Sequence, residues 1–221
     1  MIYRDPIDNI DEDVFFRCGA VTNGNDGSYI SHHIDGRRSQ MYTLVDGKMN
    51  GEYKSYHLNG RLFEKCTYID GKIHGEYKSY STNGNLRKIF SYVGGKIEGE
   101  YKIYHRNGTQ LISYIYVNNK KSGKCKNYYQ DGSMFEEYTY LDNKKDGTYK
   151  SYHPNRKLHK IYNYVNDQID GEYQEYYDNG QLKELCNFVA GIINGKYTSY
   201  YENGKLETVC DYVDGKIQQS Y

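Results

Sequence analysis

Polar and apolar positions recur along this chain with a period of 24 residues. If each unit is numbered from its first glycine as column 1, tyrosine fills columns 3 and 6 in seven of the eight units, and column 19 is always valine, isoleucine or leucine. The column-1 glycines are Gly27, Gly51, Gly75, Gly99, Gly123, Gly147, Gly171 and Gly195. Eight contiguous units of one period, over residues 27–218, predict a repeat protein.

Each unit contains two turn signals. Column 9 is always Asn or Asp, and column 10 is glycine in every unit except the one with Arg156. Columns 20 and 21 hold a second Gly-rich turn, which pairs of Asn and Asp replace in the middle units. Such turns between Tyr-, Val- and Thr-rich runs are a strong hairpin signal. We therefore predict an all-β fold, an elongated, twisted, single-layer antiparallel meander of about 16 to 18 strands built from eight hairpin repeats.

The turns also predict a strand register. With two-residue loops at columns 9–10 and 20–21, column 7 faces 12, column 5 faces 14, column 3 faces 16, column 1 faces 18, and column 16 faces column 1 of the next unit. One face of the sheet, in the second unit, then carries Gly51, Tyr53, Ser55, His57, Leu62, Cys66, Tyr68 and Ile73. The other face carries Glu52, Lys54, Tyr56, Phe63, Lys65, Thr67, Ile69 and Lys72. We expect the column-18 ring to cover the column-1 glycine, and the sheet to curve around the aromatic face.

The ends of the chain depart from the repeat. Residues 1–26 are predicted to form an N-terminal cap, in which Val14 to Thr22 resembles half of a unit. Residues 219–221 begin a ninth unit. Because a terminal strand has unpaired backbone groups, self-association is expected at the C-terminal edge strand, around Lys196 to Tyr201.

Composition narrows the classes of partner. Lys plus Arg and Asp plus Glu are both 29, so the net charge is zero, which argues against nucleic-acid binding and weakens the case for contact with a membrane surface. The 29 tyrosines supply rings that can be buried or can form contacts. No signal peptide or membrane-spanning run is seen, and five scattered cysteines form no disulfide pattern, so a cytoplasmic protein is expected.

Three groups of residues invite a chemical interpretation. His33, His57, His105 and His153 share column 7, but equivalent columns lie roughly 9.5 Å apart, too far for one metal ion. Cys66, Cys186 and Cys210 share column 16, where Phe90 and Tyr162 also occur, so these thiols are interpreted as packing groups. Glu52, Glu76, Glu100 and Glu172 alternate with lysines on a solvated face. No catalytic constellation or phosphate-binding loop is found, and we expect neither a cofactor nor enzymatic activity.

The run D-G-K-x-x-G-E-Y-K-x-Y-x-x-N-G-x-L occurs at Asp46–Leu62 and at Asp70–Leu86, and it resembles the MORN-repeat variant family. The resemblance covers residues 27–218. It implies a hairpin array used for protein association and sometimes for membrane contact. Repeats of this type occur in bacterial antitoxin-type proteins and in giant viruses of amoebae, which would imply the host cytoplasm for a viral protein.

These observations lead to a non-enzymatic scaffold that binds a protein partner through a Tyr-rich sheet face or edge. The candidate contact residues at the centre of the array are Tyr77, Tyr92, Tyr101 and Tyr116 on the aromatic face, because interface hot spots are typically central aromatic residues. The opposing expectation is that these rings form the core and that Tyr104, on the charged face, carries binding. Two alternatives are a peripheral membrane module and a carbohydrate-binding aromatic repeat protein.

Overall fold

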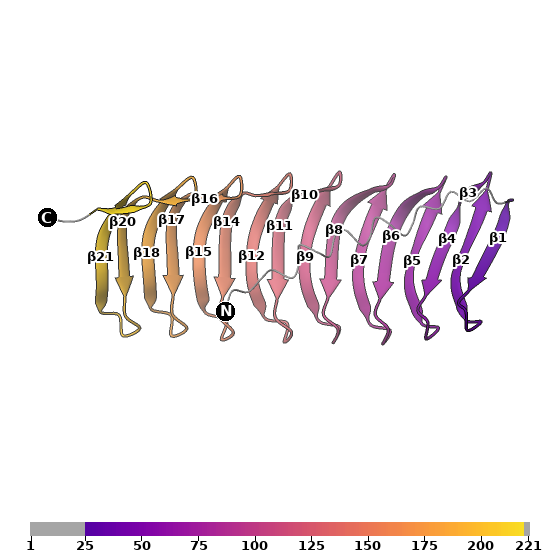
Figure 1. Ribbon diagram of the computed structural model, residues 1–221, viewed down its shortest axis with the longest axis horizontal. Helices are drawn as coiled ribbons and strands as arrows, with labels where there is room; N and C mark the ends of the chain where they lie inside the picture. The colour runs from indigo at the N-terminus through magenta and orange to yellow at the C-terminus, as the bar shows by residue number, and fades with distance from the viewer. Residues whose placement is uncertain (1–24, 219–221) are drawn as a thin grey trace.

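The computed structural model describes residues 25–218, which form one antiparallel sheet and contain no helix. Each longer strand pairs with the longer strand before it and the one after it in sequence, from β1 with β2 to β20 with β21. Figure 1 shows the resulting row of hairpins, with β1 at one end and β21 at the other. The predicted single-layer meander is therefore confirmed. The predicted cap and ninth unit lie outside the described residues, apart from Asn25 and Asp26.

Sixteen longer strands form the hairpins: β1 (Gly27–His32), β2 (Arg38–Val45), β4 (Gly51–Tyr56), β5 (Leu62–Ile69), β6 (Lys72–Tyr80), β7 (Leu86–Val93), β8 (Lys96–Tyr104), β9 (Gln110–Val117), β11 (Gly123–Tyr128), β12 (Met134–Leu141), β14 (Gly147–Tyr152), β15 (Leu158–Val165), β17 (Gly171–Tyr176), β18 (Leu182–Val189), β20 (Gly195–Tyr200) and β21 (Leu206–Val213). Six short ones complete the 22: β3 (Lys48–Met49), β10 (Lys120–Lys121), β13 (Lys144–Lys145), β16 (Gln168–Ile169), β19 (Ile192–Ile193) and β22 (Lys216–Gln218). The count exceeds the prediction because five hairpin strands are interrupted just before a column-1 glycine.

The column-1 glycine has an unusual backbone conformation, both where the strand is interrupted and where it continues through the glycine, as in β8. Gly51 has φ +97° and Gly99 has φ +80°, a conformation that L-residues with side chains rarely adopt. Beside Gly75, the equivalent glycine of the next unit, the pairing between units jumps: Thr67 faces His74, but Lys65 faces Lys78. The prediction that column 16 faces column 1 of the next unit is therefore wrong, because two extra residues of the glycine-containing strand are accommodated as a bulge.

The covering of this glycine by an aromatic ring is also not observed. A Cβ atom added to Gly51, Gly75 or Gly99 would meet no atom within 4 Å. At Gly123 it would contact Ile115 at 3.5 Å, a neighbour outside the aromatic columns. Glycine is needed in column 1 for its positive φ rather than to make room for a ring.

The first turn of each unit differs from the predicted two-residue loop. In the second unit the amide of His57 donates to the carbonyl of Arg61 (2.8 Å), and the amide of Gly60 donates to His57 (2.8 Å), which leaves a three-residue loop. Tyr56 then faces Leu62, whereas Ser55 faces Glu64, so one residue is bulged out between them. The bulge restores the predicted register, and columns 5 and 14, 3 and 16, and 1 and 18 pair as expected.

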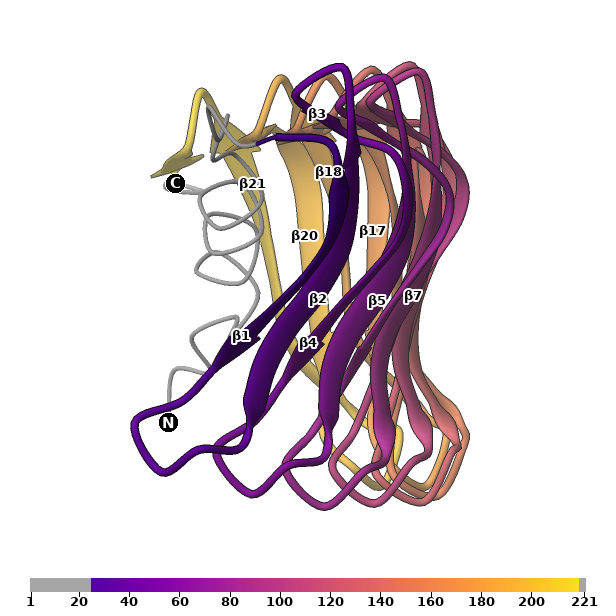
Figure 2. The ribbon, with the colours of Figure 1, turned by 90° about the vertical axis from the view of Figure 1, so that its right-hand side faces the viewer.

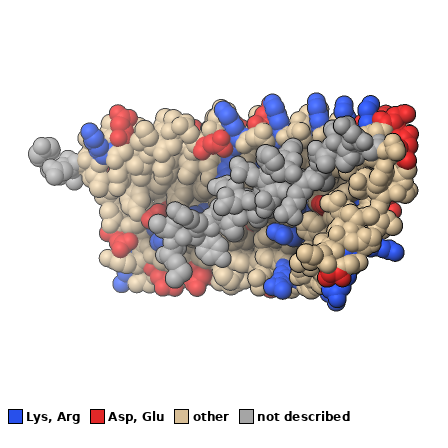
Figure 3. All heavy atoms as spheres, turned by 45° about the vertical axis from the view of Figure 1, so that its right-hand side comes forward, with Lys and Arg blue, Asp and Glu red and all other residues tan. Residues whose placement is uncertain are grey.

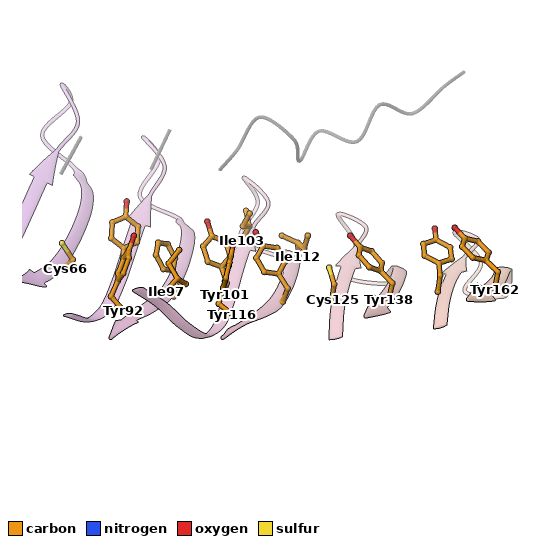
Figure 4. Packing of buried hydrophobic residues seen from close by; sticks show 14 of the residues in the cluster. Cys66, Tyr92, Ile97, Tyr101, Ile103, Ile112, Tyr116, Cys125, Tyr138 and Tyr162 are labelled. Atoms are coloured by element: carbon orange, nitrogen blue, oxygen red, sulfur yellow. The ribbon is translucent and has the colours of Figure 1, made fainter. Parts of the chain in front are cut away.

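The sheet is curved, and its two faces differ in burial. Figure 2, along the row of hairpins, shows the strands bending around one side of the sheet. The rings of columns 3, 16 and 18 project together from one face and form the hydrophobic core (Figure 4). Tyr101 is 2% exposed and Phe90 is 1% exposed. The predicted division into an aromatic face and a charged face is thus what organises the fold.

Candidate functional site: the two faces of the sheet

The rings of the aromatic face form two stacks. In the first, Tyr77, Phe90, Tyr101 and Tyr114 follow one another across four strands with centroid distances of 4.7, 4.5 and 5.0 Å. In the second, Tyr138, Tyr149, Tyr162 and Tyr173 are spaced by 6.0, 4.5 and 5.4 Å. Successive rings on adjacent strands bury each other's faces, which allows tyrosine to replace aliphatic side chains in this core.

Four of the five candidate contact residues lie in this core. Tyr77, Tyr92, Tyr101 and Tyr116 are 2–7% exposed. Tyr101 is stacked on Tyr114 and has the edge of Tyr116 against it at 5.6 Å. Their main contribution is therefore to packing. The fifth candidate, Tyr104, is half-buried at the end of β8 on the opposite face.

The buried cysteines lie at the ends of the two ring stacks. Cys125 takes the place of the column-3 tyrosine between the two stacks, and it is completely buried. Cys66 and Cys186 are also buried. Burial raises the pKa of the Cys125 thiol to about 12 and that of Cys186 to about 11, so neither is a reactive thiolate at neutral pH. The interpretation of the described cysteines as packing groups agrees with this geometry.

A row of polar side chains crosses the aromatic face, and the sequence analysis missed it. Glu64 in column 14 is 6% exposed and accepts hydrogen bonds from Ser55 (3.1 Å) and from Tyr77 of the next unit (2.6 Å). Glu136 repeats the arrangement with Asn127 and Tyr149. The signal was present in the register, because column 14 faces column 5. The carboxylates satisfy tyrosine hydroxyls that the stacks would otherwise bury unpaired.

The most highly charged part of this row surrounds Glu175. Its carboxylate forms ion pairs with Lys183 (2.8 Å) and Lys160 (3.1 Å) and accepts a hydrogen bond from the hydroxyl of Tyr173 (2.8 Å). The Nε2 atom of His159 lies 3.5 Å from the same carboxylate. The interaction with His159, together with the hydrogen bonds from Lys183, Tyr173 and Lys160, holds the pKa of Glu175 well below its usual range. The carboxylate is fully engaged as an ion-pair partner and is therefore unsuited to act as a general base.

Two lysines project over rings of the aromatic face. The ammonium group of Lys121 lies 4.9 Å from the centroid of the Tyr114 ring, and that of Lys145 lies 4.6 Å from the Tyr138 ring. These rings flank Cys125, at the gap between the stacks. The cation–π contacts place a positive charge against the ring that ends each stack beside Cys125.

The opposite face is exposed and carries a repeated charge pattern. In three successive units a column-2 glutamate bonds the column-4 lysine of the same strand: Glu52 with Lys54 at 2.7 Å, Glu76 with Lys78 at 2.5 Å, and Glu100 with Lys102 at 2.9 Å. Each glutamate side chain is at least 50% exposed. The prediction of a solvated charged face is confirmed, although the pairs form along a strand rather than across strands.

The residues that flank the second turn of each unit, at one end of the strands, combine aliphatic and basic side chains. The column-19 residues are 44–59% exposed in every unit: Val45, Ile69, Val93, Val117, Leu141, Val165, Val189 and Val213. Directly opposite them in the first five units stand the exposed lysines Lys48, Lys72, Lys96, Lys120 and Lys144. We call this row of valine, isoleucine, leucine and lysine residues the lysine ridge, and Figure 3 shows basic side chains in a row along it.

The column-7 histidines connect neighbouring units. The Nε2 atom of His57 lies 2.9 Å from the carbonyl oxygen of Tyr80, one unit further on, and His33, His105 and His153 make the same contact at 2.8–3.1 Å. Where tyrosine replaces histidine, the hydroxyl of Tyr129 donates to the carbonyl of Tyr152. Column 9 adds a parallel bond, as from Asn59 to Thr82. These side chains hold the hairpin tips together.

Two searches of the described part of the chain were negative. Within residues 25–218 no three His, Cys, Asp or Glu side chains are grouped so that they could hold a metal ion. The same residues include no helix of the length and apolar character required to cross a membrane.

The segment assigned to self-association does not lie at an edge. Strand β20 pairs with β18 on one side and with β21 on the other, so Thr198 faces both Leu185 and Val209. Thr198 and Ser199 are therefore paired on both sides, and the expectation that this strand forms an open edge is wrong. The outermost described pairing at this end is that of β21 with β22.

Comparison with solved structures gives only weak likenesses. A GtfA/B complex bound to UDP and GlcNAc is 14% identical over 52% of this chain and 22% of that chain, with a TM-score of 0.24. The TcdB2-TccC3-Cdc42 complex is 10% identical over 83% of this chain and 13% of that chain, with a TM-score of 0.22. A porin-like protein from Bacteroides uniformis is 10% identical over 86% of both chains, also with a TM-score of 0.22. The chain spans less than a quarter of the length of the first two.

No curated protein matches the sequence. A family model does match, the one described as MORN repeat variant, over residues 49–70, 73–93, 121–142, 145–166, 169–190 and 193–214. The unit between the second and third matches, around Gly99 to Val117, folds with the same pairing, Gly99 facing Tyr116 and Tyr101 facing Tyr114. The matched repeats make up more than half of the chain, and the chain belongs to the MORN repeat variant family.

Proposed function

We propose that this protein is a non-enzymatic scaffold that binds a protein partner on its exposed, charged face, along the column-6 tyrosines. The observation that carries the proposal is the difference in burial between the two faces. Four candidate tyrosines of the aromatic face are 2–7% exposed, whereas Tyr104 and its equivalents Tyr80 and Tyr128, on the opposite face, are only half-buried.

The exposed face has the composition of an interaction surface. Tyrosine offers a large, rigid contact area at a low cost in side-chain entropy. The neighbouring Glu–Lys pairs, such as Glu100 with Lys102, add charges whose order along the strand is the same in three successive units. A partner that contacts several units would gain affinity from each repeat. MORN repeats suggest a scaffold of this kind, which supports the proposal.

The proposal can be tested by capture from a native cell extract. The full chain serves as bait beside the triple variant Tyr80→Ala, Tyr104→Ala and Tyr128→Ala, and bound proteins are quantified by mass spectrometry. The control carries Val93→Thr and Val117→Thr, on the lysine ridge away from the column-6 stripe. Loss of a captured protein with the triple variant but not with the control supports the proposal. Equal capture by all three baits contradicts it.

The lysine ridge favours a second candidate function, association with an anionic membrane surface. The ridge has one exposed lysine in each of five successive units, and these lysines would attract anionic lipid headgroups. The exposed aliphatic side chains opposite them would insert shallowly into the membrane. Flotation with vesicles that contain phosphatidylserine tests this function. Binding that is lost when Lys72, Lys96 and Lys120 become glutamine supports it, and absence of binding by the unaltered chain excludes it.

A further inference from the structure

The two ends of the array differ from its interior in their backbone pairing. Between neighbouring units, columns 14 and 15 of one unit pair with columns 5 and 4 of the next, as when Glu64 faces Ser79 and Lys65 faces Lys78. The same two pairs recur at the other junctions. Among the described residues, β1 pairs only with β2, and the outer side of β21 is paired only at its last three residues. The described array therefore has two open edges, at opposite ends of the row (Figure 1).

The open edges expose residues of the columns that pair inside the array. Column 4 of β1 is Ile30 and column 15 of β21 is Val209, and they are 50% and 49% exposed. From the second to the seventh unit, every residue of columns 4 and 15 is half-buried, because each strand has a neighbour on both sides. A further strand beside β1 and β21 would cover these two aliphatic side chains in the same way.

The links between hairpin tips run in one direction along the array. In columns 7 and 9 the donor is a side chain of one unit, and the acceptor is a backbone carbonyl of the next unit. The hydroxyl of Tyr177 donates to Tyr200 (2.9 Å), and the amide of Asn179 donates to Glu202 (2.9 Å). A unit therefore offers donors to the unit that follows it and acceptors to the unit that precedes it.

The end units keep these groups without their partners. In the last unit the equivalent donors are the hydroxyl of Tyr201 and the side-chain amide of Asn203, and neither reaches a carbonyl of the described chain. In the first unit the equivalent acceptors are the carbonyls of His32 and Ile34, and no side chain within residues 25–218 donates to them. The donors of one end thus match the acceptors of the other.

We propose that copies of this chain associate head to tail, with β21 of one copy paired with β1 of the next in the register that joins neighbouring units. Val209 then faces Ile30 of the next copy, and Thr208 faces Ser31 of the next copy, as columns 15 and 14 face columns 4 and 5 elsewhere. Pairing of two like edges would leave the donors and acceptors at the tips unmatched. Such a head-to-tail contact repeats from copy to copy and forms an open row unless its rotation closes a ring.

Two departures from the repeat also match across this junction. Column 6 is tyrosine in every unit except at His32, and Glu207 is the only acidic residue in column 13. When columns 14 and 15 face columns 5 and 4, column 13 stands opposite column 6. Glu207 of one copy would therefore face His32 of the next copy, a cross-strand pair of complementary side chains.

Sedimentation velocity of the full chain over a rising series of concentrations tests the proposal. The contact is one hairpin edge wide, so the association is weak and requires concentrated protein. The expected result is an average mass that rises beyond that of a dimer, because each added copy leaves one open edge. A chain that remains monomeric at the highest concentration overturns the proposal.

Variants blocked at one end test the direction of the contact. Ile30→Glu adds a charge to the edge of β1, and Val209→Glu adds one to the edge of β21. Both residues are exposed, so the fold should be retained, which circular dichroism checks. Neither variant should self-associate alone. An equimolar mixture should form heterodimers and nothing longer, because each pair of the two variants has one unblocked junction.

Two results of this experiment contradict the head-to-tail contact. Self-association of either variant alone, at the level of the unaltered chain, would show that like edges pair. A mixture that stays monomeric would show that the two edges do not meet. The matched control is Leu58→Glu, the same charge change at an exposed residue of an inner unit, in the column that holds Glu202 in the last unit. It should associate like the unaltered chain.

The register is tested by removing the donors of the last hairpin tip. Tyr201→Phe combined with Asn203→Asp keeps the ring and a turn residue that also occurs in column 9 as Asp35. The loss of two hydrogen bonds should weaken self-association about tenfold. An unchanged dissociation constant would overturn the proposed register.

Discussion

Tyr101 and Tyr114 face each other across β8 and β9, with ring centroids 5.0 Å apart and planes inclined by 5°. Tyr101 also stacks on Phe90 of the preceding unit, at 4.5 Å. Tyr101 therefore has a stacked ring on each side, and the stack connects the packing of one unit to that of the next. This relationship explains how a sheet without a second described layer gains a hydrophobic core from tyrosine.

Removing a ring from the stack should be costly. Tyr101→Ala is expected to lower the free energy of unfolding by about 3–5 kcal/mol, the cost typical of a lost buried aromatic side chain. Tyr104→Ala, on the exposed face, should cost about 1 kcal/mol or less. Urea unfolding followed by circular dichroism measures both. Equal losses in the two variants would show that the two faces contribute alike to stability.

The bonds between hairpin tips should contribute modestly. His57→Ala removes the bond to the carbonyl of Tyr80 and should cost about 1 kcal/mol. Ser81 occupies the same column and makes no such bond to the next unit among the described residues, so Ser81→Ala is the matched control and should be neutral. Thermal unfolding of both variants is the measurement, and an unchanged midpoint for His57→Ala would argue against a bridging role.

The column-1 glycines can be tested through their backbone conformation. Gly99 has φ +80°, and an added Cβ would meet no atom within 4 Å. Gly99→Ala should therefore destabilise the protein by about 1–2 kcal/mol through backbone strain alone. Gly99→Asn should cost less, because asparagine tolerates positive φ. Chemical denaturation of the two variants distinguishes them, and a larger loss for Asn than for Ala would indicate steric exclusion instead.

The cluster around Glu175 predicts a pH dependence. The pKa of Glu175 is lowered in the folded state, so its contribution to stability is fully present above the unfolded-state pKa of about 4.3 and is lost as the pH falls towards the folded-state value. Glu175→Gln should reduce stability at pH 7 by about 1–3 kcal/mol, the cost typical of hydrogen bonds to a charged group. The difference from the unaltered chain should shrink below about pH 4. A difference that stays constant from pH 7 to pH 3 would exclude the ion pairs as its cause.

The sequence was sufficient to predict the repeat, the meander, the pairing of column 5 with 14 and of column 3 with 16, and the identity of the aromatic face. These features depend on alternation along a strand and on turn residues, which are local properties of the chain. The same information missed the bulge at Phe63 and the one beside Gly75, because both are small local insertions that preserve the side-chain pattern on either side.

Exposure was decided by the tertiary structure alone. The tyrosines of columns 3 and 6 are both regular in the sequence, yet Tyr101 is buried in a ring stack and Tyr104 is only half-buried. The valine of column 19 is equally regular and is nevertheless exposed in every unit. A sequence pattern shows which side chains share a face. Burial depends on the curvature of the sheet and on the distance between rings of neighbouring units, and these arise only when all the strands pack together.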